Sequence, residues 1–197
     1  MINTRLLSCL AFIISLAACS SFLEATTSFR DDFDFSSVES YSTYGRNSSF
    51  GDSQNLSDTT RNTIELAIEQ GFESNGFNYK TSQKADIIIA YHLLSDRFAD
   101  LDKYNLQVKY CSYCFRSGQA SRAELLKKLR SGSLILDIIN PKNESSVWRS
   151  VYPLKFKEDD NSREMQEKIS HAVNSMLRHY PRDKTISIDT NAKRELA

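Results

Sequence analysis

The sequence predicts an α+β fold, a two-layer sandwich in which a mainly antiparallel sheet of about four strands carries two amphipathic helices on one face. Two segments space apolar residues three and four positions apart, as in helices, and several short runs are rich in apolar and β-branched residues, as in strands. A proline-containing turn joins two of these runs and predicts a hairpin. Because two helices can cover only one face, the other face must be solvated, covered by an insertion or used for binding.

The first strand is expected in FRDDFDFSSVESYSTYG, which begins at Phe29 and is rich in aromatic and β-branched residues. The polar segment RNSSFGDSQNLS follows and is typical of a loop. From Ser57 the pattern predicts a helix that ends near Gly71, because a Ser or Asp can cap the first turn and apolar residues recur on one face. The apolar residues of that face are Ile64, Ala67, Ile68 and Phe72.

The second half of the chain predicts a strand, a hairpin and a helix. The branched run Ile87–Ala90 has the composition of a strand that is covered on at least one face. SLILDIIN and VWRSVYPLKF form the hairpin, with the turn at Pro141–Glu144. The last helix lies in DNSREMQEKISHAVNSMLRHYP, with Asn161 or Ser162 as its cap and Pro181 after its end.

The N-terminus carries a short apolar segment that ends in a cysteine. Leu6–Ala18 is apolar apart from two serines, but a membrane-spanning helix needs roughly 20 apolar residues. The segment follows Arg5 and has the length of the apolar core of a secretory signal. The order Leu16-Ala17-Ala18-Cys19 resembles the bacterial lipobox, which implies that the Cys19 thiol is alkylated by a diacylglyceryl group and that a peptidase cuts before it.

This resemblance implies a membrane partner, held through an N-terminal lipid. Two or three acyl chains hold a domain firmly on a bilayer, because each buried methylene contributes about 0.8 kcal/mol. Ser20 is not the aspartate that retains enterobacterial lipoproteins on the inner membrane. The expected location is therefore the periplasmic face of the outer membrane, with retention on the inner membrane as the alternative, because this sorting rule varies among bacteria.

These features divide the chain into a lipoprotein signal peptide (1–18), a tether (19–28), a single α+β domain (29–181) with an insertion at about 96–131, and a polar tail (182–197). The 25 basic and 25 acidic residues give a formal net charge of zero, so nothing in the composition calls for nucleic acid as a partner. The common nucleotide-binding and hydrolase motifs are missing from the sequence, and we expect no cofactor.

The chain contains four cysteines, of which two are left in the mature domain. Cys9 leaves with the signal and Cys19 carries lipid, so Cys111 and Cys114 remain. Two nearby thiols in an exported domain tend to form a disulfide. Their Cys-x-x-Cys spacing also suits a thiol–disulfide oxidoreductase, the main alternative for the function. The next predicted helix begins only at Ser121, too late for its N-terminus to stabilise a Cys111 thiolate.

Two further patterns predict structure more than chemistry. His92, His171 and His179 are spread over a strand and a helix without clustered spacing, so we expect no metal site. The segment SRAELLKKLRSG, which begins with a capping box at Ser121 and Glu124, predicts a short solvated surface helix; the alternative is a basic amphipathic helix that contacts anionic headgroups of the membrane.

Asp137 lies inside an apolar strand, and Trp148 and Arg149 lie across the predicted turn. The structural interpretation is an acid on the polar side of the sheet that pairs with Arg149 across the strands. The functional hypothesis is that Asp137, Trp148 and Arg149 form a binding surface. No nucleophile or base accompanies them in the sequence, so this hypothesis concerns binding and not catalysis.

Four segments then carry a family resemblance: FDFSSVESYSTY, FESNGFNYKTSQKADIIIAYH, SGSLILDIINPKNESSVWRS and AVNSMLRHYP. They resemble, in the same order, the bacterial lipoprotein family known as domain of unknown function 4136, over residues 29 to 181. Two features depart from that family: Tyr44 is followed by Gly45 where a tryptophan is usual, and the stretch from Asp96 to Arg130 is not expected. The family has no established catalytic residues, so the resemblance implies fold and location but no activity.

The function expected from these observations is that of a non-enzymatic, lipid-anchored module that binds an envelope protein or glycan. Thiol–disulfide exchange at Cys111 and Cys114 is the alternative from a different class. Transport of an apolar ligand between helices and sheet is a third hypothesis, for which the sequence has no dedicated feature.

Overall fold

A computed structural model describes residues 24–45, 56–94, 98–115, 129, 131–156 and 160–182 of the 197-residue chain. The predicted signal peptide, Cys19, the surface helix from Ser121 and the polar tail after Arg182 lie outside the described residues. None of the described helices is long and apolar enough to cross a membrane.

The centre of the fold is a six-stranded mixed sheet with the strand order β1-β6-β5-β4-β2-β3. The bounds of its strands are β1 Thr26–Phe29, β2 Ser40–Thr43, β3 Asn78–Tyr79, β4 Ile87–Leu93, β5 Ser133–Asn140 and β6 Ser145–Pro153. Three strand pairs are antiparallel: β1 with β6, β6 with β5, and β5 with β4. The other two pairs are parallel, because β2 runs parallel to both β4 and β3. The α+β class is confirmed and three of the five strand pairs are antiparallel, but the sheet has six strands where about four were predicted.

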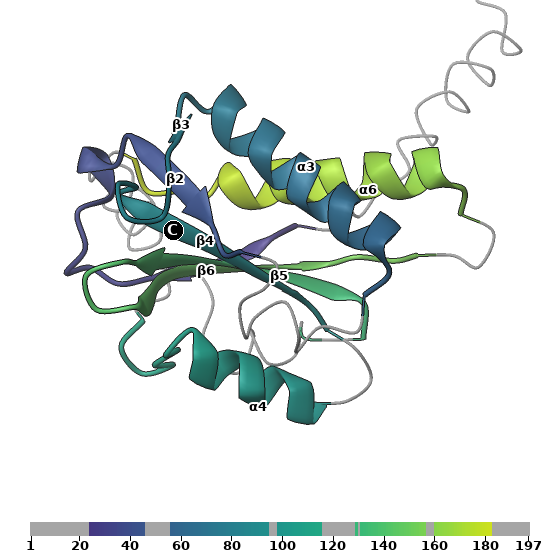
Figure 1. Ribbon diagram of the computed structural model, residues 1–197. Helices are drawn as coiled ribbons and strands as arrows, with labels where there is room; N and C mark the ends of the chain where they lie inside the picture. The colour runs from purple at the N-terminus through teal and green to yellow at the C-terminus, as the bar shows by residue number, and fades with distance from the viewer. Residues whose placement is uncertain are drawn as a thin grey trace, which may run out of the picture.

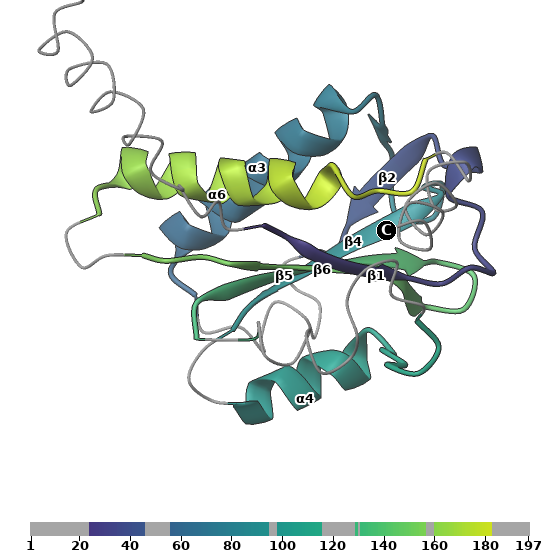
Figure 2. The same cartoon turned by 180° about the vertical axis from the view of Figure 1, so that it is seen from behind.

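The additional strands are short ones that periodicity does not reveal. β1 begins at Thr26, inside the stretch that we assigned to the tether, and Figure 2 shows it along β6 at one edge of the sheet. β3 has only two residues, both exposed. The predicted strand over 29–44 is divided, because a 3-10 turn at Phe35–Ser37 separates β1 from β2. Strands of two to four residues offer too few positions for an alternating pattern.

Helices lie on both faces of this sheet (Figure 1). α3 (Asp58–Ser74) and α6 (Ser162–Leu177) pack side by side on one face, as predicted. α4 (Phe98–Gln107) lies on the opposite face and belongs to the insertion. The expectation of two helices on one face therefore omitted α4, which covers part of the face that a two-layer sandwich would leave open.

The ends of α3 and α6 follow from their sequences. Ser57 caps α3 by accepting a hydrogen bond from the backbone N–H of Thr60, and Gly76 takes a left-handed conformation (φ 81°) just after the helix. Asn161 caps α6 in a capping box with Glu164, which decides between the two caps that the sequence allowed.

Two apolar clusters stabilise the sheet, one on each face. The main core lies between the sheet and the pair α3 and α6, where Gly71 allows close approach: a Cβ atom there would lie 2.9 Å from Leu177 Cδ1. The smaller cluster lies between the sheet and α4. Its buried members are Ala90, Leu94, Leu101, Tyr104, Val108, Ile135, Ile139 and Val151.

Candidate functional site: a buried polar cluster under α4

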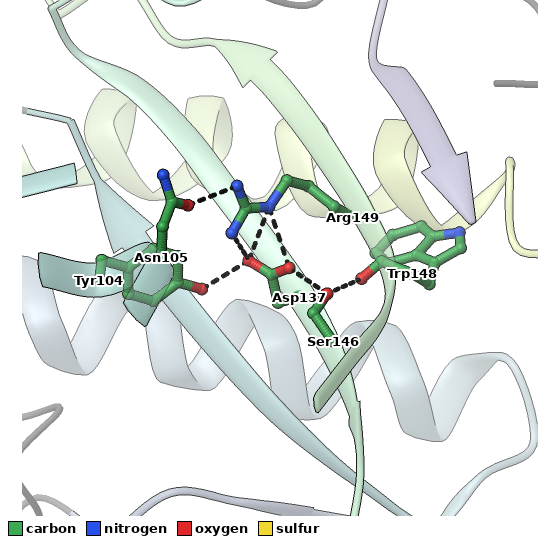
Figure 3. Close-up of polar contacts among 6 residues, drawn as sticks. All are labelled: Tyr104, Asn105, Asp137, Ser146, Trp148 and Arg149. Atoms are coloured by element: carbon green, nitrogen blue, oxygen red, sulfur yellow. Dashed lines mark hydrogen bonds and ion pairs between the residues drawn. The ribbon is translucent and has the colours of Figure 1, made fainter. Parts of the chain in front are cut away.

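The most distinctive polar feature of the described chain is an ion pair in the middle of the sheet. Asp137 on β5 and Arg149 on β6 are direct cross-strand partners, and Arg149 Nη2 lies 2.9 Å from Asp137 Oδ2. Arg149 Nε donates to both carboxylate oxygens, at 3.0 and 3.1 Å (Figure 3). The Asp137 side chain is fully buried, and only 4% of the Arg149 side chain is exposed. The pair is therefore closed to solvent.

Other side chains add hydrogen bonds to this pair, although Arg149 Nη2 meets Asp137 only as an ion-pair contact and has no hydrogen-bond partner among the described residues. The Tyr104 hydroxyl donates to Asp137 Oδ2 (2.8 Å), and the Ser146 hydroxyl donates to Oδ1 (2.5 Å). Arg149 Nη1 donates to Asn105 Oδ1 at 2.7 Å. Because Tyr104 and Asn105 both come from α4, the helix is fastened to the sheet by polar as well as apolar contacts.

A β-bulge in β6 makes this cluster geometrically feasible. Ile138 pairs with Trp148 but Ile139 pairs with Ser146, so β6 contains one extra residue, Val147, at this point. In a regular strand, residues three apart point to opposite faces. The bulge instead lets Ser146 and Arg149 both reach Asp137 on the α4 side of the sheet.

Aromatic rings enclose the guanidinium of Arg149. Its Cζ lies 3.5 Å from the centre of the Tyr110 ring and 5.6 Å from that of Tyr104. Burial is the largest single effect and lowers the pKa of Arg149, but the charge and hydrogen bond of Asp137, together with Tyr104 and Tyr110, raise the pKa overall. Burial, followed by the charge of Asp137, raises the pKa of Tyr104 well above its usual value. Arg149 therefore stays charged and Tyr104 stays protonated, as their contacts require.

His92 on β4 extends the cluster. Its ring stacks on Tyr104 with a centroid distance of 4.8 Å, and the residue is 2% exposed. Neither ring nitrogen has a hydrogen-bond partner within the described part of the chain. Burial lowers the pKa of His92 to about 4, with a smaller contribution from Arg149 in the same direction, whereas Asp100 and Asp137 raise it. His92 is therefore neutral near pH 7.

The structure contradicts the predicted binding surface of Asp137, Trp148 and Arg149. All three are buried, and Trp148 points to the opposite face, where its Nε1 donates to the carbonyl oxygen of His179 (3.4 Å). The physical reason is that α4 covers the face that the sequence left open. The cross-strand pairing of Asp137 with Arg149 is confirmed, but the pair is buried and not on a polar surface.

Cys111 and Cys114 form a disulfide, as predicted. It closes a turn just after α4, in which the backbone N–H of Cys114 donates to the Cys111 carbonyl at 3.0 Å. Cys114 is exposed, and Tyr113 between the two cysteines is 87% exposed. Within the described residues the disulfide follows a helix end and does not precede a helix start.

The three histidines lie in separate environments. His92 is buried under α4, His171 Nδ1 lies 3.2 Å from the Tyr152 hydroxyl, and His179 follows α6. In the described ranges, no three His, Cys, Asp or Glu side chains gather as a set that could hold a metal ion.

The arrangement around Asp137 is suited to holding α4 rather than to turning over a substrate, because its charges are paired, hydrogen-bonded and closed to solvent. Sequence reasoning found Asp137 and Arg149 but missed their partners. An acid in an apolar strand, opposite an arginine across a short turn, was a usable signal. The missed partners are Tyr104, Asn105, Tyr110 and Ser146, which need the bulge and α4 to be recognised.

A family described as a domain of unknown function, DUF4136, matches residues 25–182. The chain belongs to this family. Its DUF4136 domain resembles the crystal structure of a DUF4136 family protein from Bacteroides thetaiotaomicron, with a TM-score of 0.52 and 14% identity over 81% of this chain and 96% of that one. At this identity the likeness shows the fold alone.

Two solved structures are more weakly similar. A PDZ domain protein from Parabacteroides distasonis gives a TM-score of 0.48 at 15% identity, over 82% of this chain and 36% of that one. The PelC dodecamer from Paraburkholderia phytofirmans gives 0.40 at 8% identity, over 78% and 94%. No curated protein matches the chain.

Proposed function

We propose that this DUF4136 protein is a lipid-anchored module on the periplasmic face of the outer membrane, which acts by binding an envelope protein or glycan and not by catalysis. The observation that carries the proposal is the order Leu16-Ala17-Ala18-Cys19 shortly before the first strand of the domain. Lipidation at Cys19 would make this residue the first of the mature protein.

The short connection between Cys19 and β1 defines the reach of such an anchor. Only residues 20–25 separate Cys19 from Thr26, and six extended residues span about 20 Å. A lipid on Cys19 would therefore keep the domain beside the bilayer. This position favours partners at or near the membrane surface.

Replacement of Cys19 by Ala tests the anchor. We expect the Cys19→Ala protein to keep its signal peptide and to lose the mass of the lipid, so that it no longer fractionates as a mature lipoprotein. Cys9→Ala is the matched control, because Cys9 lies in the same apolar segment but not at the cut. If the mature mass and the outer-membrane fraction were unchanged in Cys19→Ala, the anchor would be wrong.

Two observations support a binding role. The charged pair of Asp137 and Arg149 is buried and therefore inaccessible to a substrate, and aromatic side chains are exposed elsewhere on the domain. Asp137 and Arg149 are sealed under α4, whereas Tyr79 is 56% exposed in β3 at an edge of the sheet and Tyr113 is 87% exposed in the disulfide turn. Exposed aromatic residues are frequent anchors in contacts with proteins.

In-cell photo-crosslinking tests the binding role. A photo-reactive phenylalanine analogue in place of Tyr79 or Tyr113 is expected to capture a partner, and mass spectrometry of the adduct distinguishes a protein from a glycan. The same analogue at Lys84, an exposed residue between β3 and β4, is the control. Equal capture at all three positions, or none above background, would contradict the proposal.

Thiol–disulfide exchange remains the second candidate, favoured by the exposure of Cys114. Its weakness is the position of Cys111 beyond the C-terminal end of α4, since a helix N-terminus is what stabilises a thiolate. We expect the purified protein to have no insulin-reductase activity above that of a Cys111→Ser, Cys114→Ser double variant. Activity lost only in the double variant would favour the exchange reaction.

A further inference from the structure

The disulfide turn and α4 together close the polar cluster, and they are connected through the aromatic residues beside the two cysteines. Tyr110 immediately precedes Cys111 and Phe115 immediately follows Cys114. The rings of Tyr110 and Phe115 lie 4.9 Å apart, so the disulfide joins the two chain segments that bring these rings together.

Tyr110 connects this turn to the charged centre. Its ring covers the Arg149 guanidinium at 3.5 Å, and its backbone N–H donates to the Asn105 carbonyl at the end of α4 (2.9 Å). Asn105 in turn accepts a hydrogen bond from Arg149 through its side chain. Displacement of Tyr110 would therefore act on Arg149 and on α4 at the same time.

α4 depends on these contacts for its position. A helix of 10 residues is marginal in water without tertiary contacts. Just after its C-terminal end, the backbone carbonyl of Val108 accepts a hydrogen bond from the N–H of Ser146 on β6 (2.8 Å). The next residue, Lys109, has a left-handed backbone conformation (φ 46°), which ends the helical path. A loosened turn after Val108 would weaken the end of α4 first.

We propose that the Cys111–Cys114 disulfide is a redox-sensitive clasp, which in its oxidised form holds Tyr110 over Arg149 and keeps α4 docked on the sheet. Cys114 is exposed, so a dithiol reductant can attack its sulfur. The reductant loses two electrons and two protons and becomes a disulfide, while Cys111 and Cys114 become two thiols. Tyr110 and α4 then move away from the sheet, and the pair of Asp137 and Arg149 is uncovered.

This switch goes beyond the proposed binding role and does not depend on the lipid anchor. It is a property of the domain, and it differs from thiol–disulfide catalysis because the disulfide acts on its own chain and needs no second protein substrate.

Hydrogen exchange of the full-length protein, with and without dithiothreitol, tests the clasp. We expect amides of α4 and of the turn 108–115 to exchange about tenfold faster after reduction, which corresponds to about 1.4 kcal/mol of local opening free energy. Amides of β5, in the centre of the sheet, should be unchanged. Unchanged exchange in α4, or equal acceleration in α4 and β5, would overturn the proposal.

Variants separate the clasp from a general effect of the reductant. The Cys111→Ser, Cys114→Ser protein should exchange like the reduced protein and should not respond to dithiothreitol. Tyr110→Ala should loosen α4 although the disulfide is intact, whereas Tyr113→Ala, in the same turn but 87% exposed, should not. Equal behaviour of the two tyrosine variants would contradict the assigned role of Tyr110.

Discussion

Protonation of His92 is expected to destabilise the domain in mildly acidic solution. The imidazole is 2% exposed, stacks on Tyr104 and has no hydrogen-bond partner among the described residues, so its charged form is disfavoured in the folded state. The pKa of His92 is lowered from 6.5 to about 4. Because the folded pKa is lower than the unfolded one, the unfolded chain binds the proton more strongly.

The stabilisation from neutral His92 is therefore complete above about pH 6.5 and is lost as the pH falls toward 4. A difference between 6.5 and 4 corresponds to about 3 kcal/mol when the loss is complete, and to about 2 kcal/mol at pH 5. The pKa of Asp86 is lowered from 3.8, chiefly by its hydrogen bond from Ser40, so its contribution is lost at more acidic pH. Between pH 8 and pH 5, the change in unfolding free energy therefore reports His92 and not Asp86.

Urea unfolding followed by fluorescence measures this effect, since Trp148 is the single tryptophan and is fully buried. His92→Phe is the matched variant, because a phenyl ring can keep the stack on Tyr104 but cannot titrate. We expect the wild-type free energy of unfolding to fall by about 2 kcal/mol more than that of His92→Phe between pH 8 and pH 5. Equal pH dependence in the two proteins would refute the assigned role of His92.

Variants at three further places in the fold test the packing and capping by the same unfolding measurement. Asp137→Ala should cost about 3–5 kcal/mol because it leaves Arg149 charged and buried, whereas the double variant Asp137→Leu, Arg149→Met should cost clearly less; equal losses would contradict this. Gly71→Ala should cost about 1–3 kcal/mol, since its Cβ would lie 2.9 Å from Leu177, and an unchanged stability would refute the close contact. Asn161→Ala should cost about 1 kcal/mol through loss of the α6 cap, and Asn161→Ser should restore most of it.

The parts of the fold that the sequence predicted are those governed by local signals. The caps and apolar faces of α3 and α6 are local patterns, and the β5–β6 hairpin follows from two apolar runs around Pro141. The disulfide needed only the spacing of Cys111 and Cys114 and the expectation of an oxidising compartment.

The parts that sequence reasoning missed depend on distant contacts. α4 is short, and its buried residues Leu101 and Tyr104, with Val108 just after it, face the sheet only because β4, β5 and β6 supply an apolar surface there. Without α4, an acid within an apolar strand predicts a polar, solvent-facing side of the sheet. With α4 in place, Asp137 is buried and accepts a hydrogen bond from Tyr104 of that helix, so it helps to hold α4 on the sheet and is not available for a contact at the surface.

The bulge at Val147 means that the cluster depends on chain length as well as on residue identity. Ser146 and Arg149, three positions apart, reach Asp137 together only because of this bulge: in a strand without it they would lie on opposite sides of the sheet, whereas loss of the extra residue would leave them two positions apart and on one side. Comparison of relatives should therefore consider the spacing of Ser146 and Arg149 together with the pairing of β5 and β6, because the residue identities alone do not tell which chains can build this cluster.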